Sequence, residues 1–263
     1  MSTGRRVILT RPASDSQTWI QGLQAAGYEA LNWPLIDIAP ATNQALIHQA
    51  LADWQQFQSV MFVSRNAVTH TFNPGTPVSG WGNTHCWATG PGTRHALLEA
   101  GVPAHLIDAP AADSAQFDTE ALWQVVHAKL LTDQPVLILR GSEADQADSA
   151  AEGVGRDWLM QQLALAGVTV STLAVYQRGC PQWTQERLEQ AGLAASDGSV
   201  WVFSSSQAVI NLQTLLPGQD WSTTTVIATH ERIGRAASLA GAGRVRLCKP
   251  SVEALLALLE SSA

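Results

Sequence analysis

The sequence predicts an α/β protein whose sheets are mostly parallel and whose chain forms two domains. Short apolar runs alternate with helical patterns along the whole chain, an arrangement typical of βα units. The chain has 263 residues, a length that suits two domains of about 130 residues each. An internal duplication supports the same division, because two similar halves predict two similar domains.

Four segments of the first half recur in the second half at a nearly constant offset. The pairs are 62–68 with 203–209, 88–101 with 228–241, 23–27 with 163–167, and 7–11 with 136–140. An acidic, Ala-rich stretch at 141–155 has no counterpart in the first half, which explains why the last pair has the smallest offset. Its four acids are expected in a solvated loop rather than in an acid/base pair, and they are Glu143, Asp145, Asp148 and Glu152.

The pattern of apolar residues predicts the elements in order along the chain. Strands are expected over residues 6–10, 28–38, 59–63, 85–88, 105–107, 135–139, 168–177, 199–203, 225–228 and 245–247. Helices with apolar residues at three-and-four spacing are expected over residues 16–26, 93–100, 119–130, 158–166, 206–215 and 252–259. Helix ends are followed by glycines that suit a left-handed cap, namely Gly27, Gly101, Gly167 and Gly241. The runs 28–38 and 168–177 are long for strands in βα units, so we expect them to pass between the domains.

Composition excludes several classes of protein. The chain is 46% hydrophobic and 14% charged, as in a compact globule. No apolar run reaches the roughly 18 residues that span a bilayer, and the run after Arg5 and Arg6 is too short for a signal peptide, so we expect a cytoplasmic protein without membrane contact. The net charge of −7 argues against nucleic-acid binding, which needs clustered Lys and Arg.

Motifs for metals and cofactors are missing from the sequence. Cys86, Cys180 and Cys248 are widely spaced and lack ligand spacing with His, which predicts reduced thiols and no metal site. There is no phosphate-loop, nucleophile-elbow or zinc-protease motif. The stretch 90–92 supplies two glycines of a dinucleotide fingerprint, but His95 stands where the third would fall. We therefore expect no cofactor.

Polar residues collect where the predicted strands end. They are Thr10-Arg11-Pro12, Ser64-Arg65-Asn66, Thr89-Gly90-Pro91-Gly92-Thr93, Arg140-Gly141-Ser142, Ser204-Ser205-Ser206-Gln207 and Thr229-His230-Glu231-Arg232. In an open parallel sheet, ligands bind outside the carboxyl ends of the strands. Helix N-termini there offer free backbone N–H groups and a partial positive charge, which suit carboxylate or phosphate. Ordinary helix capping is the alternative for each Ser and Thr, and their recurrence in both halves favours a binding site for a polyanion.

Three side chains at strand ends carry more specific chemistry. Arg11 and Arg140 end equivalent strands, where a guanidinium can pair with a ligand carboxylate or with a structural Asp or Glu. Tyr176 ends the long run at 168–177, and its phenol could give a proton to a leaving group. Packing at a domain boundary is the alternative role for Tyr176.

The motifs, in their order and spacing, resemble the uroporphyrinogen-III synthase family over essentially the whole chain. They are Thr10-Arg11-Pro12, Val63-Ser-Arg-Asn-Ala-Val68, Ala88-Thr-Gly-Pro-Gly-Thr93, Leu139-Arg140-Gly141, Val175-Tyr176, Phe203-Ser-Ser-Ser-Gln-Ala-Val209 and His230-Glu-Arg232. The resemblance implies two flavodoxin-like lobes joined by a two-stranded connection. Lobe one would combine residues 1–37 with 178–263, and lobe two would hold residues 38–177.

The resemblance also implies a reaction. The family closes the linear tetrapyrrole hydroxymethylbilane, a polycarboxylate, to uroporphyrinogen III in haem biosynthesis, with loss of water and inversion of ring D. Loss of the hydroxyl leaves a cation that the pyrrole itself stabilises, so neither a metal nor a cofactor is needed. The expected protein is a monomer that acts on this small-molecule substrate.

Site residues follow from the resemblance in the same way. Tyr176 would assist departure of the hydroxyl, while Ser64, Thr93, Ser205 and nearby backbone amides hold carboxylates. The full set of expected substrate-binding residues is Arg11, Ser64, Arg65, Asn66, Thr93, Arg140, Ser205, Ser206, Gln207 and Arg232. In the second half, Ile233 replaces the threonine that corresponds to Thr93 and His230 replaces a glycine. In the second half, binding of substrate carboxylates is therefore expected to rely on Arg232 or on backbone amides.

Two other functions are compatible with the residues. The first is a hinged, non-catalytic protein whose two lobes close on a polyanion, and catalytic turnover separates it from an enzyme. The second is a pair of flavodoxin-like domains that bind a flavin or a nucleotide, which a yellow colour or bound phosphate in the purified protein would indicate.

Overall fold

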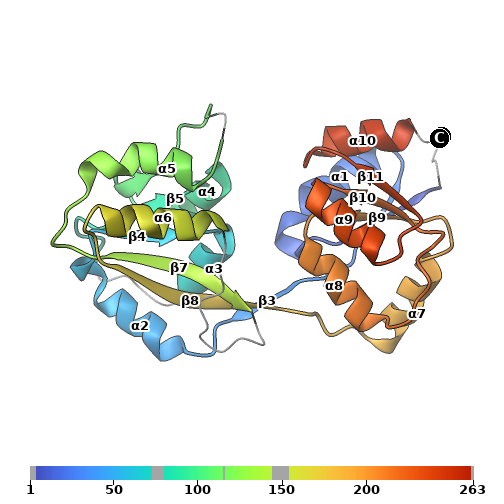
Figure 1. Cartoon of the computed structure of the whole chain (residues 1–263), viewed down its shortest axis with the longest axis horizontal. Helices are drawn as coiled ribbons and strands as arrows, with labels where there is room; N and C mark the ends of the chain where they lie inside the picture. The colour runs from blue at the N-terminus through green and yellow to red at the C-terminus, as the bar shows by residue number, and fades with distance from the viewer. Residues whose placement is uncertain (1–3, 73–79, 115, 144–153, 262–263) are drawn as a thin grey trace. The chain divides into compact units, whose positions relative to one another are not determined.

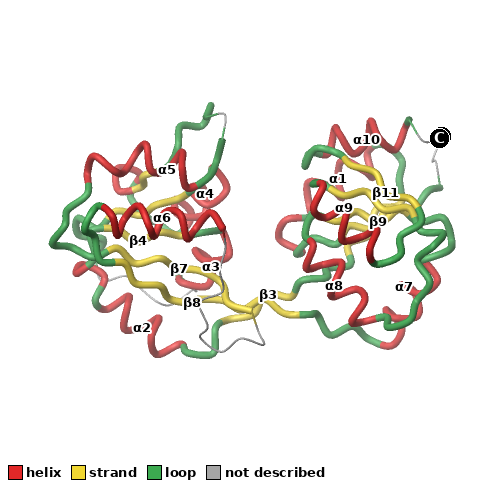
Figure 2. The backbone as a smooth tube through the Cα atoms, viewed as in Figure 1, coloured by secondary structure: helices red, strands yellow, loops and turns green. Residues whose placement is uncertain are grey.

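The computed structural model describes residues 4–72, 80–114, 116–143 and 154–261. Most of the acidic stretch at 141–155, including Asp145, Asp148 and Glu152, lies outside the described residues. The chain divides into two compact units: unit 1 is Met1–Asp37 with Gly179–Ala263, and unit 2 is Ile38–Arg178. Figure 1 colours both units along the chain, and Figure 2 shows the strands of each in yellow.

Unit 1 has a five-stranded sheet in the order β11-β10-β9-β1-β2, and all of its strand pairs are parallel. Its strands are β1 (Arg6–Leu9), β2 (Glu29–Asn32), β9 (Val200–Phe203), β10 (Thr225–Ala228) and β11 (Arg244–Leu247). Its helices are η1 (Ala13–Asp15), α1 (Gln17–Ala25), α7 (Gln185–Ala194), α8 (Ser206–Leu215), α9 (Glu231–Leu239) and α10 (Val252–Glu260).

Helices cover both faces of the unit 1 sheet, because successive strand residues point to opposite faces. On one face, Ile8, Trp201 and Phe203 pack against α7, α8 and α9. On the other face, Val7 and Val202 pack against α1 and α10. Unit 1 is therefore a three-layer αβα structure with two apolar cores.

Unit 2 has a six-stranded sheet in the order β3-β8-β7-β4-β5-β6, and the pairs from β8 to β6 are parallel. Its strands are β3 (Asp37–Pro40), β4 (Ser59–Phe62), β5 (His85–Ala88), β6 (Ile107–Asp108), β7 (Val136–Glu143) and β8 (Val170–Gly179). Its helices are α2 (Gln44–Ala52), η2 (Trp54–Gln56), α3 (Arg65–Thr71), α4 (Pro91–Glu99), η3 (Ala104–Leu106), α5 (Thr119–Val126), η4 (His127–Lys129) and α6 (Val154–Leu165).

The same alternation gives unit 2 its two cores. Val60 and Phe62 of β4 belong to a cluster that includes buried residues of α2, α3 and α4. Met61, the residue between them, packs on the opposite face with buried residues of α5 and α6. In Figure 1, α2 lies across one face of this sheet and α5 and α6 across the other.

The two sheets repeat one strand order with different parts of the chain. Strands β2, β1, β9, β10 and β11 of unit 1 correspond to β8, β7, β4, β5 and β6 of unit 2. The order within unit 1 is that of flavodoxin-like sheets. The duplicated segments occupy corresponding elements, so the α/β fold with two related parallel sheets is confirmed. Unit 1 takes its strands from both ends of the chain, and unit 2 is continuous.

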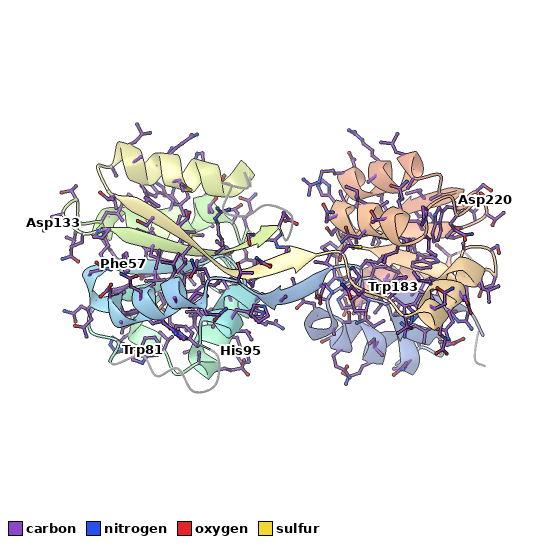
Figure 3. The ribbon with its side chains drawn as sticks, turned by 90° about the horizontal axis from the view of Figure 1, so that it is seen from below. Phe57, Trp81, His95, Asp133, Trp183 and Asp220 are labelled. Atoms are coloured by element: carbon purple, nitrogen blue, oxygen red, sulfur yellow. The ribbon has the colours of Figure 1, made fainter. Side chains whose placement is uncertain are left out.

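The single strand expected over residues 28–38 is wrong. The structure has β2 and β3 in its place, separated by the stretch 33–36. Trp33 is buried against Trp183 and Trp201, with ring centroids 6.3 and 5.6 Å apart. The indole Nε1 of Trp183 donates to the carbonyl of Pro34 at 3.2 Å (Figure 3). Pro34 has no N–H to give a sheet, so this stretch is held by the core of unit 1 instead.

The helix-ending glycines are confirmed. Gly27, Gly101, Gly167 and Gly241 have φ of 85°, 86°, 77° and 94°, a left-handed conformation that disfavours side chains with Cβ. No helix in the described part of the chain combines the length and apolar character needed to cross a membrane.

Candidate functional site

In unit 2, two helix N-termini lie side by side at the carboxyl edge of the sheet. β4 and β5 are neighbours, with Phe62 opposite Ala88, and each leads directly into a helix. Ser64 caps α3 by accepting a hydrogen bond from the N–H of Ala67 at 3.2 Å. Gly90 precedes α4 in an extended conformation with φ −158° and no side-chain cap. Backbone N–H groups of both turns are thus presented at one edge.

Unit 1 repeats this arrangement where β9 and β10 end. Ser205 caps α8 by accepting from the N–H of Gln207 at 3.2 Å. His230 caps α9, and its Nδ1 accepts from the N–H of Arg232 at 3.2 Å. His230 has φ −157°, close to that of Gly90, and any residue adopts such extended backbone. Replacement of the glycine by His230 therefore leaves the turn unchanged.

Tyr176 lies on β8 in a hydrophobic core of unit 2, and polar groups contact its hydroxyl. Only 2% of the residue is exposed. Its Oη lies 3.2 Å from Ser64 Oγ and accepts a hydrogen bond from Arg178 Nη2 at 3.3 Å. The Arg178 guanidinium is 5.6 Å from the ring centroid, and the His70 ring stacks on the phenol at 5.9 Å with an interplanar angle of 27°. The structure thus brings together Tyr176 and Ser64, two residues that the sequence motifs had marked separately.

A glycine accommodates the Tyr176 ring. The pairing of β7 with β8 shifts between Arg140 and Gly141, so Gly141 stands opposite Tyr176. A Cβ on Gly141 would lie 2.5 Å from Tyr176 Cζ and 3.0 Å from Oη. Only a residue without a side chain fits beside this ring.

The two arginines expected at strand ends occupy different places. Arg11 follows the end of β1, and its guanidinium lies 4.1 Å from the centroid of Trp19. Its buried Nε has no hydrogen-bond partner within the described part of the chain, and burial lowers the pKa of Arg11. Arg140 does not end its strand, because β7 continues to Glu143 after the irregularity at Gly141. The expectation of equivalent strand ends is corrected for Arg140.

Other expected residues divide between exposed and internal positions. In unit 2, Arg65 is exposed and Thr93 is buried. Asn66 is half-buried on α3. A Cβ on Gly92 would lie 3.4 Å from Arg65 Nη2, which places this guanidinium beside the start of α4.

The expected residues of unit 1 also differ in their surroundings. Arg232 is exposed on α9, and the Ser206 Oγ is buried without a hydrogen-bond partner among the described residues. Gln207 Nε2 donates to Asn211 Oδ1 at 2.9 Å, and Asn211 Nδ2 donates to the Leu35 carbonyl at 2.7 Å. Gln207 is exposed, and its side chain is linked through Asn211 to the backbone at Leu35.

Sequence reasoning missed three groups around the phenol. Arg178 follows Tyr176 by two residues on a strand, a spacing that puts both on one face and could have revealed it. His70 comes from α3, and no sequence pattern connects it with β8. The contact with Gly141 depends on the shift in strand pairing.

Comparison with known proteins gives consistent matches. A family model described as uroporphyrinogen-III synthase HemD matches residues 17–257. A uroporphyrinogen-III synthase of Synechococcus elongatus is 26% identical over 230 residues, covering 83% of this chain and 78% of that protein. The porphyrin biosynthesis protein HemD of Ruminiclostridium josui is 24% identical over 103 residues, and the match covers 38% of this chain but only 20% of that protein's length. The crystal structure of uroporphyrinogen-III synthetase from Helicobacter pylori shares the fold, with a TM-score of 0.55 and 16% identity over 98% of this chain and 100% of that one.

Gly141→Ala should destabilise unit 2, because the new methyl group collides with the Tyr176 ring. Overpacking of this kind costs about 1–3 kcal/mol. Gly92→Ala is the matched control, since its Cβ meets only Arg65 at 3.4 Å and alanine favours the α4 helix. Thermal unfolding followed by circular dichroism measures both. Equal melting temperatures for the two variants would contradict the close packing at Gly141.

His70 should make stability depend on pH. Burial lowers the pKa of His70, so the unfolded chain takes up a proton more readily than the folded chain does. Stability should fall as pH drops through about 6.5 and level off below the folded pKa. In His70→Asn, the loss of melting temperature from pH 7 to pH 5 should shrink by roughly 1–2 °C.

His95→Asn is the control for this titration. His95 is exposed on α4 beside Glu99, so its replacement reports any effect of a His→Asn substitution that is unrelated to burial. Parallel pH profiles for wild type and His70→Asn would show that His70 does not contribute.

Proposed function

The chain belongs to the uroporphyrinogen-III synthase family, and from that membership we propose that it closes hydroxymethylbilane to uroporphyrinogen III with loss of water and inversion of ring D. The observation that carries the proposal is the family match over residues 17–257, together with a tyrosine hydroxyl held beside Ser64 at the carboxyl edge of a parallel sheet. Parallel sheets bind their ligands at this edge.

Several groups at these edges suit the carboxylates of the substrate. Helices α4, α8 and α9 have nine or ten residues each, and their N-terminal N–H groups and dipoles favour anions. Guanidinium groups at or near the same edges can form bidentate pairs with carboxylates. We assign substrate contact to Arg11, Ser64, Arg65, Asn66, Thr93, Arg140, Ser205, Ser206, Gln207 and Arg232.

Tyr176 assists departure of the hydroxyl as the source of the proton that the leaving water needs. When the carbon–oxygen bond breaks, the pyrrole nitrogen shares the positive charge, so the protein needs to provide an acid and a position. Arg178 lies next to the oxygen that would carry negative charge after proton transfer. The remaining contribution is to hold the folded tetrapyrrole in the geometry for ring closure, which lowers the entropic part of the barrier.

The organisation of the protein is proposed on the same basis. The expected lobes are 1–37 with 178–263 and 38–177, and the two compact units have their limits at 37/38 and 178/179. Action as a cytoplasmic monomer, without cofactor, metal or nucleic-acid partner, stays a prediction from the sequence.

Purified protein incubated with freshly prepared hydroxymethylbilane should give mainly the type III isomer. Oxidation of the products and chromatographic separation of the porphyrin isomers measures the ratio. Only type I isomer at the uncatalysed rate, from protein shown to be folded, would contradict synthase activity and leave a non-catalytic polyanion binder.

Tyr176→Phe should lower kcat by about 10²-fold or more while KM changes little, because the phenol acts in the transition state. Tyr28→Phe is the matched control, since Tyr28 is the other tyrosine of the chain and is buried in the core of unit 1. Steady-state kinetics on both variants, with melting temperatures to check folding, measures the effect. A kcat unchanged from wild type would remove Tyr176 from the mechanism.

A further inference from the structure

The phenol proposed as the acid is almost closed off from outside. Tyr176 is 2% exposed, whereas Ser64, which its Oη contacts at 3.2 Å, is half-buried at the N-terminus of α3. The Tyr176 ring is also covered by His70 on one face and meets the backbone at Gly141. Of the two hydroxyl groups in this contact, Ser64 is the more accessible to a substrate.

Either hydroxyl can donate in this contact, and the count of donors and acceptors is satisfied when the phenol is the donor. Arg178 has only donors, so the Tyr176 Oη accepts its hydrogen bond and keeps its own hydrogen for another partner. Ser64 Oγ accepts from the Ala67 N–H and has a second lone pair. When the Tyr176 hydroxyl donates to that lone pair, the Ser64 hydroxyl can donate its own hydrogen to a bound substrate. The three side chains then form one chain of donors from Arg178 through Tyr176 to Ser64.

We propose that Ser64 is the group that protonates the departing hydroxyl. Tyr176 donates its own proton to Ser64, and Arg178 positions the phenol. This inference rests on the proposed synthase function. Ser64 Oγ gives its hydrogen to the hydroxyl oxygen as the carbon–oxygen bond breaks and water leaves. In the same step Ser64 Oγ takes the hydrogen of Tyr176, which becomes a phenolate beside Arg178. The proton released by the substrate when the ring closes returns along the same path, so no proton is gained or lost overall.

Arg178 acts through Tyr176 and is therefore a positioning residue. Its Nη2 is 3.3 Å from the oxygen that becomes negative, where a guanidinium stabilises charge strongly in a site that excludes water. Lysine at this position keeps the charge, and glutamine does not.

The duplication supplies a matched comparison for Ser64. Ser205 holds the corresponding place in unit 1 and caps α8, just as Ser64 caps α3. The structure gives Ser205 no phenol partner among the described residues, and Tyr28 belongs to the core cluster of α1 and α10. A serine that only caps a helix and binds a carboxylate should behave like Ser205.

A double-mutant cycle on turnover tests the proposal. Ser64→Ala should lower kcat by about 10²-fold, as Tyr176→Phe does, and the double variant should be within about twofold of the single ones. Ser205→Ala combined with Tyr176→Phe should instead multiply the two separate effects. Ser64→Thr keeps both the hydroxyl and the helix cap, so it should keep most of the wild-type activity. This variant tests the hydroxyl even if Ser64→Ala folds poorly. A raised KM with unchanged kcat in Ser64→Ala, or multiplied effects with Tyr176→Phe, would overturn the relay.

Arg178 variants add a readout that a merely structural role would not change. Arg178→Lys should keep more kcat than Arg178→Gln, with similar KM values, and only Arg178→Gln should shift the pH–rate profile. Arg235→Gln, on the exposed side of α9, is the control and should leave the rate unchanged. Equal rates for Arg178→Lys and Arg178→Gln would overturn the role of the charge.

A spectrum without turnover separates the relay from the synthase activity. The chain has two tyrosines, so labelling tyrosine with ¹³C at Cζ gives two resonances. Ser64→Ala and Arg178→Gln should each move the Tyr176 resonance and leave that of Tyr28 in place. Ser251→Ala, which removes a similar cap from α10, should move neither. An unmoved Tyr176 resonance overturns the hydrogen-bonded chain even in an active enzyme, whereas a wild type that makes no type III isomer overturns the proposed function itself.

Discussion

The pairing of β1 with its two neighbours is the constraint on which the rest of the structure depends. β1 lies between β2, which follows it closely in the chain, and β9, with Val7 opposite Val200. A parallel sheet of this order needs a crossover from β2 to β9, and in this chain the crossover contains the whole of unit 2. All strand pairs of the unit 1 sheet are parallel, so the carboxyl ends of its strands lie at one edge of the sheet.

Both units have kept helix N-termini at the carboxyl edge of their sheets, but the side chains near that edge differ between the units. Both units place a serine cap and an extended turn beside each other at the ends of neighbouring strands. The strands next to them have diverged. β8 carries Tyr176 and Arg178, whereas the chain after the corresponding β2 turns into the core at Trp33 and Pro34. Both units thus carry helix N-termini of the kind that suits anions, and the acid that we propose lies in unit 2.

Local rules in the sequence predicted the parts of the fold that depend on neighbouring residues. The glycine caps, the serine caps and the alternation of strands with helices follow from backbone conformation and periodicity. The break in the run 28–38 did not follow, because it depends on packing of Trp33 against tryptophans distant in sequence. The surroundings of Tyr176 were equally hidden, since a shift in strand pairing puts Gly141 against the ring and α3 brings His70 to its face.

The continuity of unit 2 sets an order of events during protein synthesis. All strands of unit 2 are synthesised before β9, so unit 2 has its complete set of strands before unit 1 does. β1 and β2 precede unit 2 in the chain, but β1 lacks its partner β9 until about Val200 is available. Pairing over such a long separation costs loop entropy and slows folding. β1 is therefore among the last strands to reach all of its final partners, and this apolar strand remains open to mispairing throughout that delay.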